Sequence, residues 1–116
     1  MPIIINNGES VLKTINFSKM GGLVPAIIQD VNTDKVLMLG FMSPEAYERT
    51  KETGYVYFWS RTRQALWMKG ETSGNKLKVI ESYVDCDDDT FLFKVTIEGE
   101  GVCCHTGAET CFTHIS

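Results

Sequence analysis

The chain has no long apolar run, no signal peptide, no internal repeat and no C-x-x-C pair. No window approaches the roughly 18 consecutive apolar residues of a membrane-spanning helix, and the opening MPIIINNGES has neither the basic flank nor the apolar core of a secretory leader. We therefore expect a cytoplasmic protein with reduced cysteines and no membrane partner. Neither a Walker A sequence nor GxGxxG occurs, so the familiar nucleoside-triphosphate and dinucleotide sites are not expected.

The 116 residues, 43% hydrophobic and 22% charged, suffice for one compact soluble domain, which we expect over residues 1–116. The formal charge of −4 argues against sequence-independent binding to nucleic acid or to an anionic membrane. The charges are segregated, because residues 61–78 hold five bases and one acid, whereas residues 81–89 hold five acids and no base. These blocks are either two solvated faces or an anion-binding wall beside a cation-binding wall.

Runs rich in Val, Ile, Phe and Tyr between turn residues predict a β-rich α+β fold, a small single domain with antiparallel or mixed sheets and one or two short helices. One helix is well delimited, because Ser43 can cap it, Pro44 suits its first position and Gly54 can end it. A second short helix is expected within residues 9–17. The predicted strands are residues 25–31, 36–42, 55–59, 65–69, 76–84 and 90–97, the first two joined as a hairpin.

The acidic run Asp85, Cys86, Asp87, Asp88 and Asp89 has two interpretations. In an extended segment, a period of two places Asp85, Asp87 and Asp89 on one face and Cys86 with Asp88 on the other. Three carboxylates on one face repel each other unless a hard cation such as Mg²⁺ or Ca²⁺ lies among them. The alternative is an ordinary charged turn before a strand.

Four cysteines lie in the last third of the chain. Cys104 and Cys111 bracket CHTGAETC, whose glycine permits a turn that brings both sulfurs together, and Cys86 would make a third thiolate. Three protein ligands leave the fourth position of a tetrahedral zinc ion open, as in catalytic sites. Cys103 would close the site as a fourth ligand, but adjacent side chains diverge in extended chain, so we interpret it as a free, buried or half-buried thiol.

The two histidines have different interpretations. His105, beside a candidate ligand, is a ligand, a general base or a packed side chain, whereas His114 has no partner pattern and is expected to be structural. A nucleobase deaminase is excluded, because its H-x-E and P-C-x-x-C sequences do not occur. A non-catalytic zinc module remains as the alternative, and it would need Cys103 as its fourth ligand.

The basic segment SRTRQALWMKGETSG, residues 60–74, carries groups suited to an anionic ligand. Arg61 and Arg63 project together if the segment is extended, and guanidinium groups bind phosphate oxygens in a bidentate manner. Lys69 and Ser73 add a charge and a hydroxyl for a second anion, and Trp67 offers a flat surface on which a base can stack.

Five segments in this order and spacing, LVPAIIQD, VLMLGFMSPEA, SRTRQALWMKGETSGN, DCDDDT and CHTGAETCF, resemble the phosphoribosyl-AMP cyclohydrolase family of histidine biosynthesis. The resemblance runs from about Phe17 to the C-terminus. Its departures are Thr62 for a common Ser, Leu77 for a common Gln, and Cys103 for a small residue. Some relatives carry a fused pyrophosphohydrolase domain; because the chain stops at Ser116, only the cyclohydrolase step is expected.

The resemblance implies an intertwined homodimer that opens the adenine ring of phosphoribosyl-AMP by hydrolysis. It implies one zinc ion per subunit, held by cysteines from both chains, and His105 as the residue that assists proton transfer. The zinc ligands would be Cys86, Cys104 and Cys111, and the magnesium ligands Asp85, Asp87 and Asp89. The candidates for binding the substrate are Arg61, Arg63, Trp67, Lys69 and Ser73.

Overall fold

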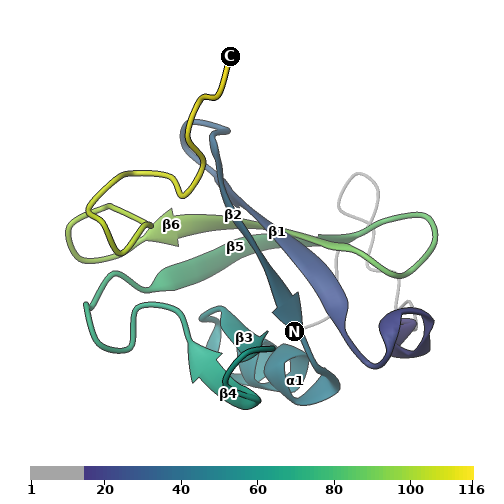
Figure 1. Ribbon diagram of the computed structural model, residues 1–116. Coiled ribbons are helices and arrows are strands. Elements are labelled where there is room, and N and C mark those ends of the chain that lie inside the picture. Colours follow the sequence, from purple (N-terminus) through teal and green to yellow (C-terminus); the bar gives the residue numbers. More distant parts are fainter. Residues whose placement is uncertain (1–14) are drawn as a thin grey trace.

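The computed structural model describes residues 15–116 (Figure 1). Six strands, one α-helix and one short 3-10 helix form the described part of the chain. In chain order they are η1 (Phe17–Met20), β1 (Val24–Asp30), β2 (Val36–Met42), α1 (Pro44–Thr53), β3 (Tyr57–Ser60), β4 (Ala65–Met68), β5 (Leu77–Val84) and β6 (Phe91–Ile97).

Four strands form a mixed sheet in the order β2-β1-β6-β5. The hairpins β1–β2 and β5–β6 are antiparallel, and they join through a parallel pairing of β1 with β6 in which Ile28 lies opposite Phe93. Strands β3 and β4 form a separate antiparallel hairpin. The predicted α+β, β-rich class is therefore confirmed.

One face of the sheet carries the core. Val24, Ala26 and Ile28 alternate along β1 as fully buried residues, and Phe91 and Phe93 do the same along β6. Helix α1 and the β3–β4 hairpin lie against this face (Figure 1). The ring of Tyr47 from α1 stacks on Phe91 at 4.8 Å between centroids. Each fully buried Phe contributes about 1.5–3 kcal/mol, so these rings hold the helix onto the sheet.

A β-bulge changes the face that β5 buries. The register with β6 shifts between Val79 and Glu81, and the extra residue, Ile80, is 45% exposed. Before the bulge Val79 is buried, and after it Ser82 and Val84 are buried. Because a one-residue shift inverts the alternation, the bulge allows both halves of β5 to cover the same core.

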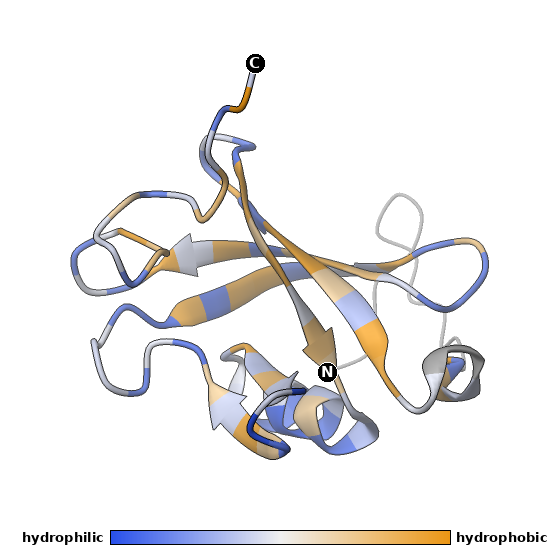
Figure 2. Cartoon of the chain, in the orientation of Figure 1, coloured by the Kyte–Doolittle hydropathy of each residue, from blue (hydrophilic) through white to orange (hydrophobic). Residues whose placement is uncertain are grey.

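The opposite face of the sheet carries an apolar row across all four strands. The register places Leu39 of β2 beside Ile27 of β1, Ile27 beside Leu92 of β6, and Leu92 beside Tyr83 of β5. Leu39 is 46% exposed, and the other three are half-buried. Figure 2 shows the apolar residues along these strands. Within residues 15–116, this face is therefore less completely covered than the core face.

The predicted helix is confirmed at both ends. The Ser43 hydroxyl accepts a hydrogen bond from the Ala46 amide at 3.2 Å, Pro44 is the first helical residue, and Gly54 ends the helix at φ +80°. A serine cap of this kind contributes about 0.5–2 kcal/mol. In the described part of the chain no helix is long and apolar enough to cross a membrane.

The predicted strands are all present, with boundaries that differ by one or two residues. The largest difference is at β3, which begins at Tyr57 because Tyr55 instead forms an isolated bridge with Lys78 of β5. The second predicted helix lies mostly outside the described residues. Of its range, residues 15 and 16 are not helical, and Phe17 begins η1.

Candidate active site

The C-terminal segment, residues 98–116, folds back on itself without forming a helix or strand. The Cys104 amide donates to the Ala108 carbonyl at 3.0 Å, and the Gly107 amide donates back to the Cys104 carbonyl at 2.9 Å. Gly107 adopts φ +93°, which L side chains rarely adopt, so the glycine makes this turn possible. The turn brings Cys104 and Cys111 close enough for each thiol to shift the pKa of the other, as expected from the sequence.

The three thiols of this segment differ in acidity. Burial raises the pKa of Cys103, which is 2% exposed, to about 12. Burial also raises the pKa of Cys111, and the neighbouring Cys104 adds to that effect. The pKa of Cys104 is lowered, chiefly because the Thr106 hydroxyl donates a hydrogen bond to its sulfur at 3.1 Å. The Lys69 ammonium acts to lower the pKa of all three, but Cys104 is the thiol whose pKa is lowered overall.

A pocket of about 350 Å³ opens beside these thiols. Cys104 and His105 line it on one side, and Lys69 and Ser73 line it on the other. A second pocket of about 240 Å³ shares Lys69, Ser73 and His105 and adds Trp67. Because the two pockets have these lining residues in common, they adjoin each other between the β4–β5 connection and the C-terminal loop, and together they are called the cleft below.

A third pocket of about 270 Å³ lies between β2 and the turn that joins β3 to β4. Both Arg61 and Arg63 line it, but they do so from a turn and not from the extended segment that the prediction assumed. The Arg61 guanidinium lies 4.0 Å from the centroid of the Phe41 ring, whereas that of Arg63 lies 5.8 Å from the centroid of Trp67. Arg63 and Trp67 also line the 240 Å³ pocket, so they connect the two basic regions.

The acidic residues gather in the turn between β5 and β6. Carboxylate oxygens of Asp85, Asp87 and Asp89 all lie within 4.8 Å of one another. The segment is a turn and not the extended strand that the alternation suggested, because Asp88 adopts φ +63° and the Asp89 amide closes back onto the Asp85 carboxylate at 3.1 Å. Partial burial raises the pKa of Asp85, but hydrogen bonds from the Asp89, Thr90 and Asp87 backbones outweigh it and lower the pKa overall.

Cys86 does not lie near the other cysteines. It is exposed in the β5–β6 turn, whereas the segment with Cys104 and Cys111 follows the opposite end of β6 (Figure 1). Strand β6 has seven residues, so at about 3.3 Å per residue its two ends are roughly 20 Å apart. One chain therefore does not bring the three predicted thiolates together.

One residue near the site, Thr106, was missed in the sequence, although its hydroxyl two positions after Cys104 donates to the Cys104 sulfur. His114, which was expected to be structural, is exposed in the C-terminal segment. Cys103 is a buried free thiol, which agrees with the interpretation made for it.

Fold and site together define a small α+β protein in which thiols suited to a soft cation adjoin a cleft lined by basic side chains, while a carboxylate cluster suited to a hard cation lies at the far end of the sheet. The family model described as phosphoribosyl-AMP cyclohydrolase matches residues 38–113. The chain belongs to the phosphoribosyl-AMP cyclohydrolase family.

Comparison with individual proteins agrees with this family assignment. The chain is 58% identical over 98 residues to the phosphoribosyl-AMP cyclohydrolase of Desulfatibacillum aliphaticivorans, covering 84% of this chain and 78% of the relative. It is 50% identical over 106 residues to the phosphoribosyl-AMP cyclohydrolase of Clostridium botulinum, an alignment that covers 91% of this chain and 94% of the relative. The histidine biosynthesis bifunctional protein HisIE of Bacteroides thetaiotaomicron is 57% identical over 98 residues, and the chain spans 47% of its length.

Proposed function

We propose that the protein hydrolyses 1-(5-phosphoribosyl)-AMP in histidine biosynthesis, opening its adenine ring to give the phosphoribosyl-formimino-aminoimidazole carboxamide ribotide. The observation that carries this proposal is the cleft that unites Cys104, His105 and Lys69 in a chain of this family. Water adds to C6, the ring carbon that carries the amino group, and the C6–N1 bond breaks, so that C6 becomes the carboxamide carbon and N1 takes up the proton. We infer that the reaction takes place in the cytoplasm.

The donor groups fit the two metals that the family resemblance implies. Cys104 and Cys111 offer two neighbouring sulfurs, and the lowered pKa of Cys104 favours the thiolate that zinc requires. Asp85, Asp87 and Asp89 offer oxygens only, which suits Mg²⁺. Cys104 and Cys111, together with Cys86, would hold the zinc ion, which when bound would supply a water whose pKa is near 7.

The remaining side chains of the cleft bind and orient the substrate. The substrate carries two phosphate groups, and a protein of net charge −4 needs local bases to bind them. Arg61 and Arg63 lie in one pocket and Lys69 with Ser73 in the adjoining cleft, so each region serves one anionic end. Trp67 lines both the 270 Å³ pocket and the 240 Å³ pocket, and its ring stacks on the base of the substrate.

His105 transfers the proton. Its side chain is exposed and lines the same pocket as Cys104, which is where a group that passes a proton to the leaving ring nitrogen is needed. A positioned base of this kind contributes about 10²- to 10⁴-fold to a rate.

Two copies of the chain complete the site. The rough separation of 20 Å between the ends of β6 keeps Cys86 from the C-terminal thiols of its own chain. A second copy supplies the missing sulfur, and the apolar row of Leu39, Ile27, Leu92 and Tyr83 provides a self-complementary surface on which the copies pack. The zinc ligands are thus shared between the chains of a homodimer.

The alternative of a closed, non-catalytic zinc module is less well supported. It needs Cys103 as a fourth ligand, but Cys103 is packed into the hydrophobic core at 2% exposure, whereas Cys104 is half-buried and Cys111 is exposed.

The test is to incubate the purified protein with phosphoribosyl-AMP and follow the ultraviolet absorbance change of ring opening, with and without a zinc chelator. We expect turnover that the chelator abolishes and that zinc restores. His105→Ala should lose about 10²- to 10⁴-fold, and His114→Ala, an exposed histidine of the same loop, serves as the matched control with full activity. No turnover by the zinc-loaded protein would refute the proposal.

A further inference from the structure

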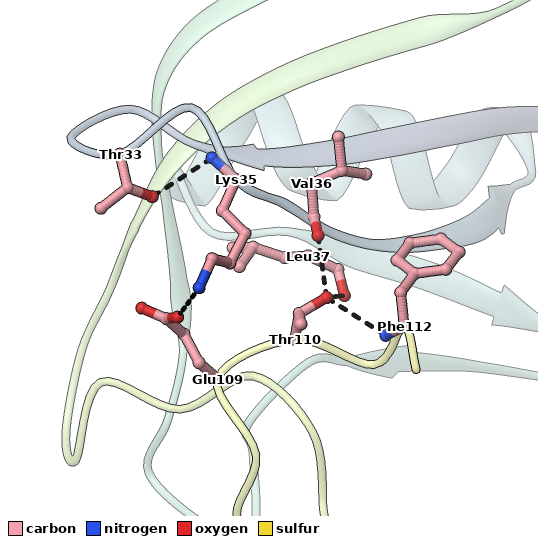
Figure 3. Close-up of polar contacts among 7 residues, drawn as sticks. All are labelled: Thr33, Lys35, Val36, Leu37, Glu109, Thr110 and Phe112. Carbon is pink, nitrogen blue, oxygen red and sulfur yellow. Dashed lines mark hydrogen bonds and ion pairs between the residues drawn. The ribbon is translucent and has the colours of Figure 1, made fainter. Parts of the chain in front are cut away.

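The loop that carries Cys104 and Cys111 is tied to the first residues of β2 by one side chain, Thr110 (Figure 3). The Thr110 hydroxyl lies 2.8 Å from the Val36 carbonyl oxygen and 3.0 Å from the Leu37 carbonyl oxygen, and it donates its proton to this pair. The same oxygen accepts a hydrogen bond from the Phe112 amide at 3.1 Å. One hydroxyl therefore joins the segments before and after Cys111 to a strand 73 or 74 positions earlier.

The backbone of Cys111 is held at the same place. Its amide donates to the Leu37 carbonyl at 2.7 Å. Leu37 is fully buried, so this anchor belongs to the rigid part of the sheet. The loop has no helix or strand of its own, and its position therefore depends on such contacts.

A second contact in Figure 3, the ion pair between Lys35 and Glu109, is of a different kind. Both side chains are almost half exposed, at 48% and 44%. An exposed pair contributes little to stability, so the hydroxyl of Thr110 is the principal side-chain anchor.

We propose that Thr110 is a positioning residue for the thiolate site: its hydroxyl fixes the Cys111 backbone against β2, so that the Cys111 sulfur stands beside Cys104 before any metal binds. The inference rests on the thiolate site of the proposed function. A loop anchored in advance loses less conformational freedom when zinc is bound. Serine retains the hydroxyl that this role requires, whereas valine has the shape of threonine without it.

The test compares Thr110→Val and Thr110→Ser with Thr113→Val, the same substitution at an exposed position of the same loop. The dissociation constant for zinc is measured by competition with a chromophoric chelator, and amide exchange of Cys111 and Phe112 is measured in the metal-free protein. We expect Thr110→Val to bind zinc about three- to tenfold more weakly and to lose protection at both amides, as the loss of one hydrogen bond predicts. Thr110→Ser should stay within about twofold of the parent, and Thr113→Val should be unchanged.

Unchanged zinc affinity in Thr110→Val would overturn the inference, and so would a serine variant as weak as the valine variant, because packing and not the hydroxyl would then matter. If the valine variant does not fold, Thr110→Ala removes the hydroxyl without adding a methyl group and takes its place. Failure of the proposed function is a separate result. A parent protein that binds no zinc and opens no ring would remove that function, while amide exchange would still show whether Thr110 anchors the loop.

Discussion

Mixing two inactive variants offers the sharpest test of the shared thiolate site. Zinc–sulfur bonds of about 2.3 Å require ligand sulfurs within roughly 4.6 Å of one another. The ends of the seven-residue β6 are separated by roughly 20 Å, which side chains as short as cysteine do not bridge. Cys86→Ser and Cys111→Ser should therefore each lose zinc and activity when purified alone.

A mixture of the two variants should recover part of the zinc content and part of the activity. After exchange of subunits, half of the dimers contain one chain of each kind. In such a dimer one site has lost both cysteines, while the other combines an intact Cys86 with an intact Cys111. One site in two is restored in half of the dimers, so the mixture should regain about a quarter of the zinc and of the activity of the unsubstituted protein.

The assay is the ring-opening rate and the zinc content, measured before and after subunit exchange. A mixture of Cys104→Ser with Cys111→Ser is the matched control, because both losses fall on the same loop and no intact site can form. Recovery in the control, or none in the Cys86 mixture, would refute the shared site.

Three further predictions concern single side chains. Asp87→Asn should keep its zinc but lose its response to added Mg²⁺, which a magnesium titration of the rate measures; an unchanged response would remove the carboxylate cluster from the mechanism. Cys103→Ser should keep zinc and activity but lose about 1–3 kcal/mol of stability in urea, because a hydroxyl replaces a buried thiol. Burial, helped by Glu48, raises the pKa of Tyr47 from 10.0 to about 12. The neutral phenol therefore stabilises the fold fully below pH 10, and about 2 kcal/mol should be lost as the pH rises through 12. Unfolding curves of Tyr47→Phe across this range should lack that loss.

Local signals predicted the helix more accurately than the sheet. The Ser43 cap, Pro44 and Gly54 act within a few residues of the helix ends, so the sequence alone places both ends. The bulge in β5 was not foreseen, because Ile80 follows Val79 as a second apolar residue and yet is exposed. The parallel pairing of β1 with β6 joins segments more than sixty residues apart, and no local pattern encodes it.

In the candidate site, too, the local features were predicted from the sequence and the long-range ones were not. The turn at Gly107 is local, and the expectation that it unites Cys104 and Cys111 is confirmed. The separation of Cys86 from them depends on the length and direction of β6, which only the assembled sheet reveals. The three aspartates do gather, but through a turn at Asp88 that alternation along a strand does not predict.

The parallel pairing also affects how the chain folds during synthesis. Strand β1 is made early, yet its neighbour on one side, β6, ends only at Ile97. Until that residue leaves the ribosomal exit tunnel, Ala26 and Ile28 have no partner strand on that side, and closing so long a loop is slow. The nascent β1–β2 hairpin therefore exposes one unpaired strand edge until β6 is made, and such an edge can pair with another chain.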